Sequence, residues 1–172
     1  MPNILFIADT HFYHNNILKY ENRPFSSIEE MNERLIDNWN SRVKTNDKIF
    51  MLGDFMFAHK NKLPELVSRL NGYKILVMGN HDQLSPLTYI NAGFSEVYRY
   101  PVIFENFYIL SHAPMYINSN MPYANIFGHI HSNPSYKDYT RQSICVSVER
   151  KHMNYYPISF NEIKELMESS TD

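Results

Sequence analysis

The chain has 172 residues, with 16 Lys and Arg against 18 Asp and Glu, a formal net charge of −2, and one cysteine, Cys145. This balance, without a basic run, argues against a protein that grips long nucleic acid, and a lone cysteine excludes an intramolecular disulfide and a cysteine-based zinc cluster. The length suits a single domain over residues 1–172. No apolar stretch approaches the ~20 residues that span a bilayer, and the N-terminal run has no positively charged lead, so we expect a cytoplasmic protein without membrane contact.

Six apolar runs have the length of β-strands. The first three are apolar almost throughout, as expected of strands that are covered on both faces. In chain order the runs are residues 3–8, 48–52, 74–78, 107–110, 124–127 and 143–148.

Helical patterns lie between and after these runs. The clearest is Ser26–Val43, where Ser27 and Glu30 fit a capping box and apolar residues recur on one helical face. Two further helices are expected at about 63–70 and 161–167. The alternation of strands and helices in the first half predicts parallel strands with right-handed crossovers.

The second half has a different pattern. Residues 97–104 and 107–111 are separated by only two residues, which predicts a hairpin, while 118–122 and 133–141 are expected to form loops. The whole chain is therefore predicted to be an α/β protein with a mixed sheet or two packed sheets.

Polar residues follow five of the apolar runs at the point where each run ends. In open α/β sheets the ligand site lies beyond the carboxyl ends of the strands, so these side chains are expected to gather at one edge. Carboxylate oxygens and imidazole nitrogens suit divalent transition metals, and Gly53, Gly79 and Gly128 would let the backbone approach the site closely. The polar residues are Asp9 and His11, then Asp54, then Asn80, His81 and Asp82, then His112, then His129 and His131.

This ordered set, from Asp9 to His131, resembles that of the calcineurin-like metallophosphoesterases. The resemblance implies a two-sheet βαβ sandwich flanked by helices and two divalent transition-metal ions, with manganese ahead of iron, zinc, nickel or cobalt. It also implies a role for each residue. Asp9, His11 and His131 would bind one ion, Asn80, His112 and His129 the other, Asp54 would bridge both, His81 would lie near the leaving group, and Asp82 would be the carboxylate partner of His81.

The chain departs from the protein phosphatases of this superfamily, because GDFMFAHK after the second run lacks their further Asp and Arg. It is similar instead to the small, uncapped bacterial and phage-type branch. His14 and Arg23 are candidates for substrate contact, with solvated loop residues as the alternative.

The function implied is hydrolysis of a phosphoester by a water activated between two ions, with His81 donating a proton to the leaving alkoxide. A phosphodiester in a nucleotide-type small molecule is the leading substrate. A phosphomonoesterase and a nuclease acting on DNA or RNA ends are the alternatives, followed by a non-catalytic scaffold of the same fold. A homo-oligomer is left open.

Overall fold

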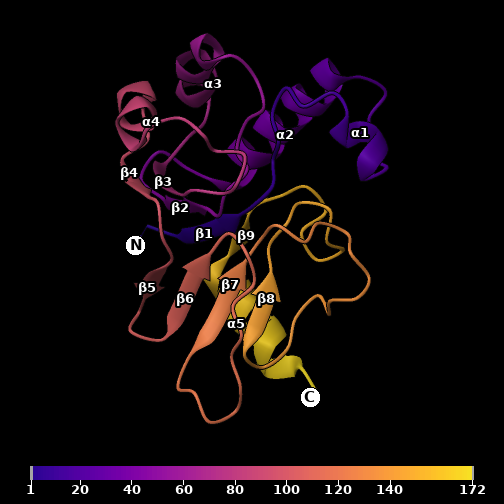
Figure 1. Ribbon diagram of the computed structural model, residues 1–172, viewed down its shortest axis with the longest axis vertical. Coiled ribbons are helices and arrows are strands. Elements are labelled where there is room, and N and C mark those ends of the chain that lie inside the picture. Colours follow the sequence, from indigo (N-terminus) through magenta and orange to yellow (C-terminus); the bar gives the residue numbers. More distant parts are fainter. Residues whose placement is uncertain (1, 172) are drawn as a thin grey trace.

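The computed structural model describes residues 2–171 and consists of two packed β-sheets with helices α1 to α4 on the outer side of the first sheet (Figure 1). The first sheet has the strand order β4-β3-β2-β1-β9, and the second has the order β5-β6-β7-β8. The two-sheet α/β sandwich predicted from the sequence is thus confirmed.

Parallel pairing in the first sheet brings the ends of its strands to one edge. In β1 (Ile4–Ile7) and β2 (Lys48–Met51), Ile4 pairs with Lys48, and Lys48 in turn pairs with Tyr73 at the start of β3 (Tyr73–Val77). The three strands therefore finish side by side. β4 (Glu96–Tyr98) is parallel to β3, and the short β9 (Ile158–Ser159), which was not predicted, is antiparallel to β1.

The second sheet corrects one expectation. The stretch 97–104 was predicted as one strand of a hairpin, but it divides at Pro101 into β4 of the first sheet and β5 (Val102–Phe104) of the second. Proline lacks the N–H that a continuing ladder needs, which accounts for the break. The hairpin itself is present between β5 and β6 (Tyr108–Ser111), and β7 (Ala124–Phe127) and β8 (Ser143–Cys145) follow in parallel.

The predicted long helix is α2 (Ile28–Arg42). The Ser27 side chain caps it by accepting from the Glu30 N–H, but the Glu30 carboxylate bonds to Ser26 rather than closing the expected box. The complete capping box lies at Ser159 and Glu162, at the start of α5 (Phe160–Ser169). The other helices are α1 (Ile17–Tyr20), α3 (Leu63–Ser68) and α4 (Pro86–Ala92), of which α3 was predicted. None of the helices within residues 2–171 is long and apolar enough to cross a membrane.

Aromatic rings fill the space between the two sheets. Phe6 of β1 stacks on Phe50 of β2 at 5.2 Å between ring centroids, and Phe104 of β5 meets both rings at 5.9 and 5.3 Å. Phe160 of α5 closes the cluster against Phe6 and Phe104. Edge and stacked pairs of this kind contribute beyond the apolar area they bury, so the sheets are held in one orientation.

The two sheets also meet directly at the edge where their parallel strands end. Ala8, just after β1, forms a parallel bridge with Ser147, and its N–H donates to the Val146 carbonyl at 2.9 Å. The carboxyl ends of strands from both sheets consequently face one another across this seam, and the polar residues that follow them face each other too.

Candidate metal centre

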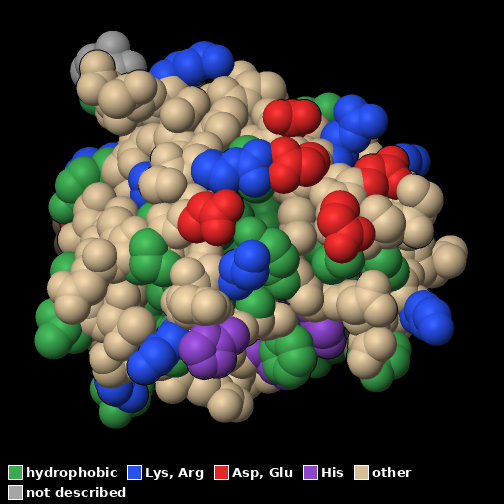
Figure 2. Space-filling model, turned by 90° about the horizontal axis from the view of Figure 1, so that it is seen from above, with side chains coloured by type: hydrophobic (Ala, Val, Ile, Leu, Met, Phe, Trp, Pro, Cys, Tyr) green, Lys and Arg blue, Asp and Glu red, His purple; other side chains and the backbone are tan. Residues whose placement is uncertain are grey.

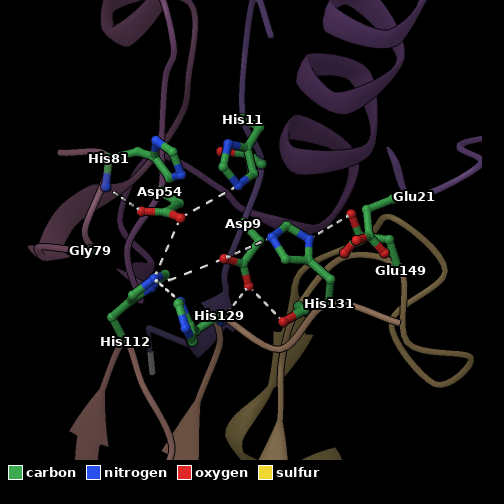
Figure 3. Close-up of polar contacts among 12 residues, drawn as sticks. Asp9, His11, Glu21, Asp54, Gly79, His81, His112, His129, His131 and Glu149 are labelled. Atoms are coloured by element: carbon green, nitrogen blue, oxygen red, sulfur yellow. Dashed lines mark hydrogen bonds and ion pairs between the residues drawn. The ribbon is translucent and has the colours of Figure 1, made fainter. Parts of the chain in front are cut away.

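The seven predicted metal ligands converge at this seam. Each follows a strand: Asp9 and His11 follow β1, Asp54 follows β2, Asn80 follows β3, His112 follows β6, and His129 and His131 follow β7. Figure 3 shows the carboxylates of Asp9 and Asp54 at the middle of a ring of imidazoles. The structure therefore brings together the seven side chains that were predicted as metal ligands.

The donors form two groups that share Asp54. In the inner group, one donor atom each from Asp9, His11, Asp54 and His131 lie within 4.8 Å of one another. In the outer group, Asp54, His112 and His129 do the same, and the Asn80 carbonyl oxygen lies 3.0 Å from His112 Nε2. Asp54 Oδ2 is 3.5 Å from His11 Nε2 and 3.4 Å from His112 Nε2, so this carboxylate faces both groups.

Two buried atoms in the inner group lack a hydrogen-bond partner among the described residues. They are Asp9 Oδ1 and His11 Nε2, which is unusual because buried polar atoms are nearly always bonded. A carboxylate oxygen and an imidazole nitrogen left free on the same side fit a divalent transition metal. The donor set therefore fits the cations that the sequence resemblance implies.

Outer hydrogen bonds orient two of the imidazoles toward the centre. His112 Nδ1 lies 2.9 Å from the Leu52 carbonyl oxygen, which can only accept, so Nδ1 carries the proton. His131 Nδ1 lies 3.1 Å from Glu149 Oε1 in the same way. In both rings Nε2 is left facing the carboxylates, which is the arrangement that fixes the tautomer of a metal-ligating histidine.

Burial sets the protonation of the inner group without metal. It raises the pKa of Asp9 to about 6, even though His131 and His112 oppose the shift, and it lowers the pKa of His11 to about 3. His11 is therefore neutral, which is the form that ligates metals. Burial also raises the pKa of Asp54, but the hydrogen bond and charge of His112 outweigh it and hold that pKa near 2.

His112 and His131 carry the compensating charge. Burial lowers the pKa of His112 and His131, but neighbouring carboxylates outweigh burial and raise both pKa values to about 9. Asp54 and Asp9 act on His112, while Glu149 and Asp9 act on His131. Without metal, the protonated rings of His112 and His131 thus supply positive charge that bound cations would otherwise supply.

The backbone at the centre adopts conformations that L-residues rarely take. Five of the candidate ligands have positive φ angles, which cost of order 1–3 kcal/mol each and persist only where the surroundings enforce them. Bonds such as His129 N–H to Asp9 Oδ2 at 2.8 Å and His11 N–H to the Asp54 carbonyl at 3.0 Å hold these turns. The residues are Asp9 (59°), His11 (48°), Asp54 (56°), His129 (72°) and His131 (47°).

Glycines bring the loops into contact, as the sequence predicted. A Cβ on Gly79 would overlap Asp54 Oδ1, and one on Gly53 would overlap the His112 ring. Gly53 also has φ +86°, which favours glycine. Any side chain at either position would push two ligands apart.

His81 and Asp82 diverge although they are consecutive. The His81 N–H donates to Asp54 Oδ1 at 2.9 Å, and its half-buried ring lies 5.4 Å from the His11 ring. Asp82 was expected to be the carboxylate partner of His81, but it is buried and accepts the backbone N–H groups of Asp54, Gly79 and Phe55 at 2.7 to 3.1 Å. We therefore correct its role: it shapes the two ligand-bearing loops.

Arg23 also differs from expectation. Its side chain is fully buried, and it donates to the Thr10 and Asp9 carbonyls at 2.8 and 2.6 Å and to Glu149 Oε1. A guanidinium so enclosed cannot reach a substrate, so Arg23 fastens the loop after β1. His14, the other candidate for substrate contact, is half-buried, with its ring 4.4 Å from that of Phe57.

The sequence reasoning missed Glu149 and Ser147. Glu149 bonds to both Arg23 and His131; burial raises its pKa, but these two neighbours outweigh burial and bring the pKa to about 2. The Ser147 hydroxyl donates to Asp9 Oδ2 at 2.5 Å. Glu149 directly follows the sixth apolar run, so the rule that selected the other residues could have found it, whereas Ser147 lies within that run and follows strand β8 only in the structure.

Fold and donor set together describe an α/β protein with a candidate metal site at the carboxyl ends of the strands. The family model for calcineurin-like phosphoesterases matches residues 2–161, and the chain belongs to this family. Family membership and the donor cluster indicate a phosphoesterase that depends on divalent metal.

The comparisons also give individual relatives. The chain is 41% identical to an uncharacterized protein of Methanocaldococcus jannaschii over 98% of this chain and 93% of that protein. It is 31% identical to the Gene 66 protein of Mycobacterium phage L5 over 51% of this chain and 43% of that protein.

Two solved structures share the fold. A protein of unknown function from Aquifex aeolicus has a TM-score of 0.74 and 29% identity, covering 97% of this chain and 100% of that one. The nuclease MPE of Pseudomonas putida has a TM-score of 0.51 and 19% identity, covering 74% of this chain and 61% of that one, and at this identity the likeness concerns the fold alone.

Proposed function

We propose that the protein hydrolyses phosphodiesters in nucleotide-type substrates with the help of two divalent transition-metal ions, manganese first among them. The observation that carries the proposal is the shared position of Asp54, whose carboxylate faces both donor groups. The inner group would hold one ion and the outer group, with Asn80, the second. Bound there, such ions lower the pKa of water and offset charge on phosphate oxygens.

The chain's own residues would supply the rest of the reaction. Asp82 and Arg23 fix the loops so that the ligands keep their places before substrate arrives. A water oxygen would bond to phosphorus, the bond from phosphorus to the leaving oxygen would break, and His81 would hand a proton to that oxygen. The proton released by the attacking water would return to solvent and, over the cycle, His81 would be reprotonated.

Two pockets flank the cluster and favour a diester over a monoester. One, of about 430 Å³, has His81 in its wall, and the other, of about 230 Å³, includes Asn80, His112 and Arg99. A phosphodiester has a substituent for each pocket, whereas a monoester would leave one empty.

A substrate panel tests the proposal on protein reloaded with manganese or zinc. We expect turnover of bis-p-nitrophenyl phosphate to exceed that of p-nitrophenyl phosphate, turnover of cyclic nucleotides, and loss of all activity with a chelator. Turnover of single-stranded DNA alone would make the protein a nuclease. Metal uptake without turnover of any ester would favour the non-catalytic scaffold. A protein that binds no metal and hydrolyses no ester would refute the proposal.

A further inference from the structure

A row of aromatic rings leads from the metal centre to the protein surface. Successive ring centroids are 5.7 Å apart from His81 to Phe57, 4.4 Å from Phe57 to His14 and 6.2 Å from His14 to Tyr20. Phe57 is 51% exposed and Tyr20 is 70% exposed, so solvent reaches both. Figure 2 shows histidine side chains at one edge of the molecule with hydrophobic and basic side chains beside them.

Two rings of this row, His81 and Phe57, line a cavity of about 430 Å³, which lies within the range of about 300–1,000 Å³ typical of small-molecule pockets. Its inner wall is apolar, with Met56 and Tyr89 buried beneath it. Its exposed rim carries the His59 imidazole and the Gln83 amide. The pocket therefore combines an apolar wall with hydrogen-bonding groups at the edge.

Phe57 is held in place by the backbone that carries the metal ligands. Its N–H donates to the Phe12 carbonyl at 2.9 Å, and Met56 forms a parallel bridge with Phe12. Phe12 directly follows His11, and Phe57 lies three residues after Asp54. The backbone from which the Phe57 ring projects is thus tied to the loop that carries His11.

We propose that this pocket binds the nucleobase of the alcohol that leaves during hydrolysis, with Phe57 as the stacking face. The inference rests on the proposed function, because it assigns one half of the diester to a subsite. His81 stands between the pocket and the donors, and Figure 3 shows it on the opposite side of the cluster from Glu149. A group that takes its proton from His81 is therefore next to Phe57.

The chemistry of the walls favours a base over other leaving groups. A planar heteroaromatic ring can use the face of Phe57 and bond at its edge to His59 or Gln83. An alkyl chain would leave those rim groups without a partner, and a bare sugar would not need the ring face. Lys60 and Lys62, both exposed and just beyond His59, add positive charge suited to a nucleotide.

The experiment compares substrates that differ only in the base. The probes are the methyl phosphodiester of adenosine and its abasic counterpart, the methyl phosphodiester of 1-deoxyribose, hydrolysed by manganese-loaded protein. The leaving alkoxides of the two probes are closely matched, so both need a proton from His81 to nearly the same extent. We expect kcat/KM to favour adenosine, mainly through KM, with adenosine and methyl phosphate as products.

Variants assign the preference to Phe57. Phe57→Leu keeps an apolar side chain but loses the ring face, and it should reduce the preference by about tenfold, the order found for base–aromatic stacking. Phe57→Tyr retains an aromatic ring and should keep the wild-type preference. Phe107→Leu is the matched control, because Phe107 is 39% exposed, lies at the opposite end of β6 from His112, and is not among the residues that line this pocket.

The outcomes separate the subsite from the proposed function. Equal loss on both probes in Phe57→Leu, or products that are only adenosine monophosphate and methanol, would overturn the subsite while hydrolysis stands. If wild type hydrolyses neither probe, saturation-transfer NMR with adenosine still decides: binding that Phe57→Leu removes supports the subsite, and its absence overturns it. If the preference for a base were seen only with a short single-stranded DNA, the pocket would bind a base within a DNA strand rather than the base of a free nucleotide.

Discussion

The inner and outer donor groups share Asp54 but differ in how they are enclosed. Asp9, His11 and Asp54 are at most 2% exposed, and the inner group is braced by Ser147, Arg23 and Glu149. In the outer group His129 and Asn80 are exposed, and His112 is held through the Leu52 carbonyl. Preorganised, buried donors need little rearrangement on binding, so the inner group is expected to hold its ion more tightly and the outer group to exchange its ion more readily.

The largest effect is expected where the groups meet. Asp54→Ala removes one donor from each of the two groups. Replacing a residue that only hydrogen-bonds to a metal ligand lowers metal affinity by up to roughly 100-fold, so the loss of Asp54 should lower the affinity of each group by more than that. His129→Ala is the control, because it touches the outer group alone and should leave about one ion bound. Elemental analysis after reloading measures both. If Asp54→Ala retained two ions, Asp54 would not be a ligand shared by the two groups.

His81 belongs to neither group, so its replacement separates proton donation from metal binding. His81→Gln should keep both ions and lose about 10²–10⁴-fold in rate on a ribose or alkyl phosphodiester, where the leaving oxygen needs a proton. The loss should be far smaller on a p-nitrophenyl ester. Rates across leaving groups of graded pKa, together with metal content, give the answer. A uniform loss accompanied by lost metal would make His81 a support for its loop.

Glu149 tests whether bracing causes the difference between the groups. Glu149→Gln leaves Arg23 buried without its counter-charge and His131 without its carboxylate acceptor, so inner-site affinity should fall about 10–100-fold and unfolding free energy by several kcal/mol. Glu33→Gln breaks the exposed Arg69 pair and should change stability by no more than about 1 kcal/mol. Titration calorimetry and denaturant unfolding measure the two effects. Unchanged inner-site affinity in Glu149→Gln would show that burial alone suffices.

The protons on His112 and His131 give a pH test with a definite sign. Their pKa values are raised to about 9, so below pH 9 each must lose a proton before it can ligate, and metal affinity should rise with pH up to about 9. The metal-free protein should behave oppositely. Raised folded-state pKa values stabilise it below pH 6.5, and that stability is lost as pH rises through 9. Calorimetry in buffers of different ionisation enthalpy should detect proton release at neutral pH, and binding without release would contradict the assignment.

The fold and the convergence of the candidate ligands were predictable because they depend on regular structure. Parallel strands in register end at the same edge of the sheet. The residues that follow them therefore lie close together, largely independently of the loop conformations. The roles of Asp82 and Arg23 were not predictable in this way. Asp82 and His81 are neighbours that point in different directions, and only the turn conformation decides which side chain meets backbone N–H groups. Strand β9 was missed because two residues give no periodicity to detect.

The bond between Ser147 and Asp9 joins residues 138 positions apart, and that between Arg23 and Glu149 spans 126. Contacts of such high sequence separation form late in folding, because much of the chain must be ordered before they close. On the ribosome, Asp9 and His11 are made well before Ser147 and Glu149, two of the residues that brace them. The inner group can therefore reach its final form only after residues 147–149 have been synthesised, and capture of its ion would follow that step.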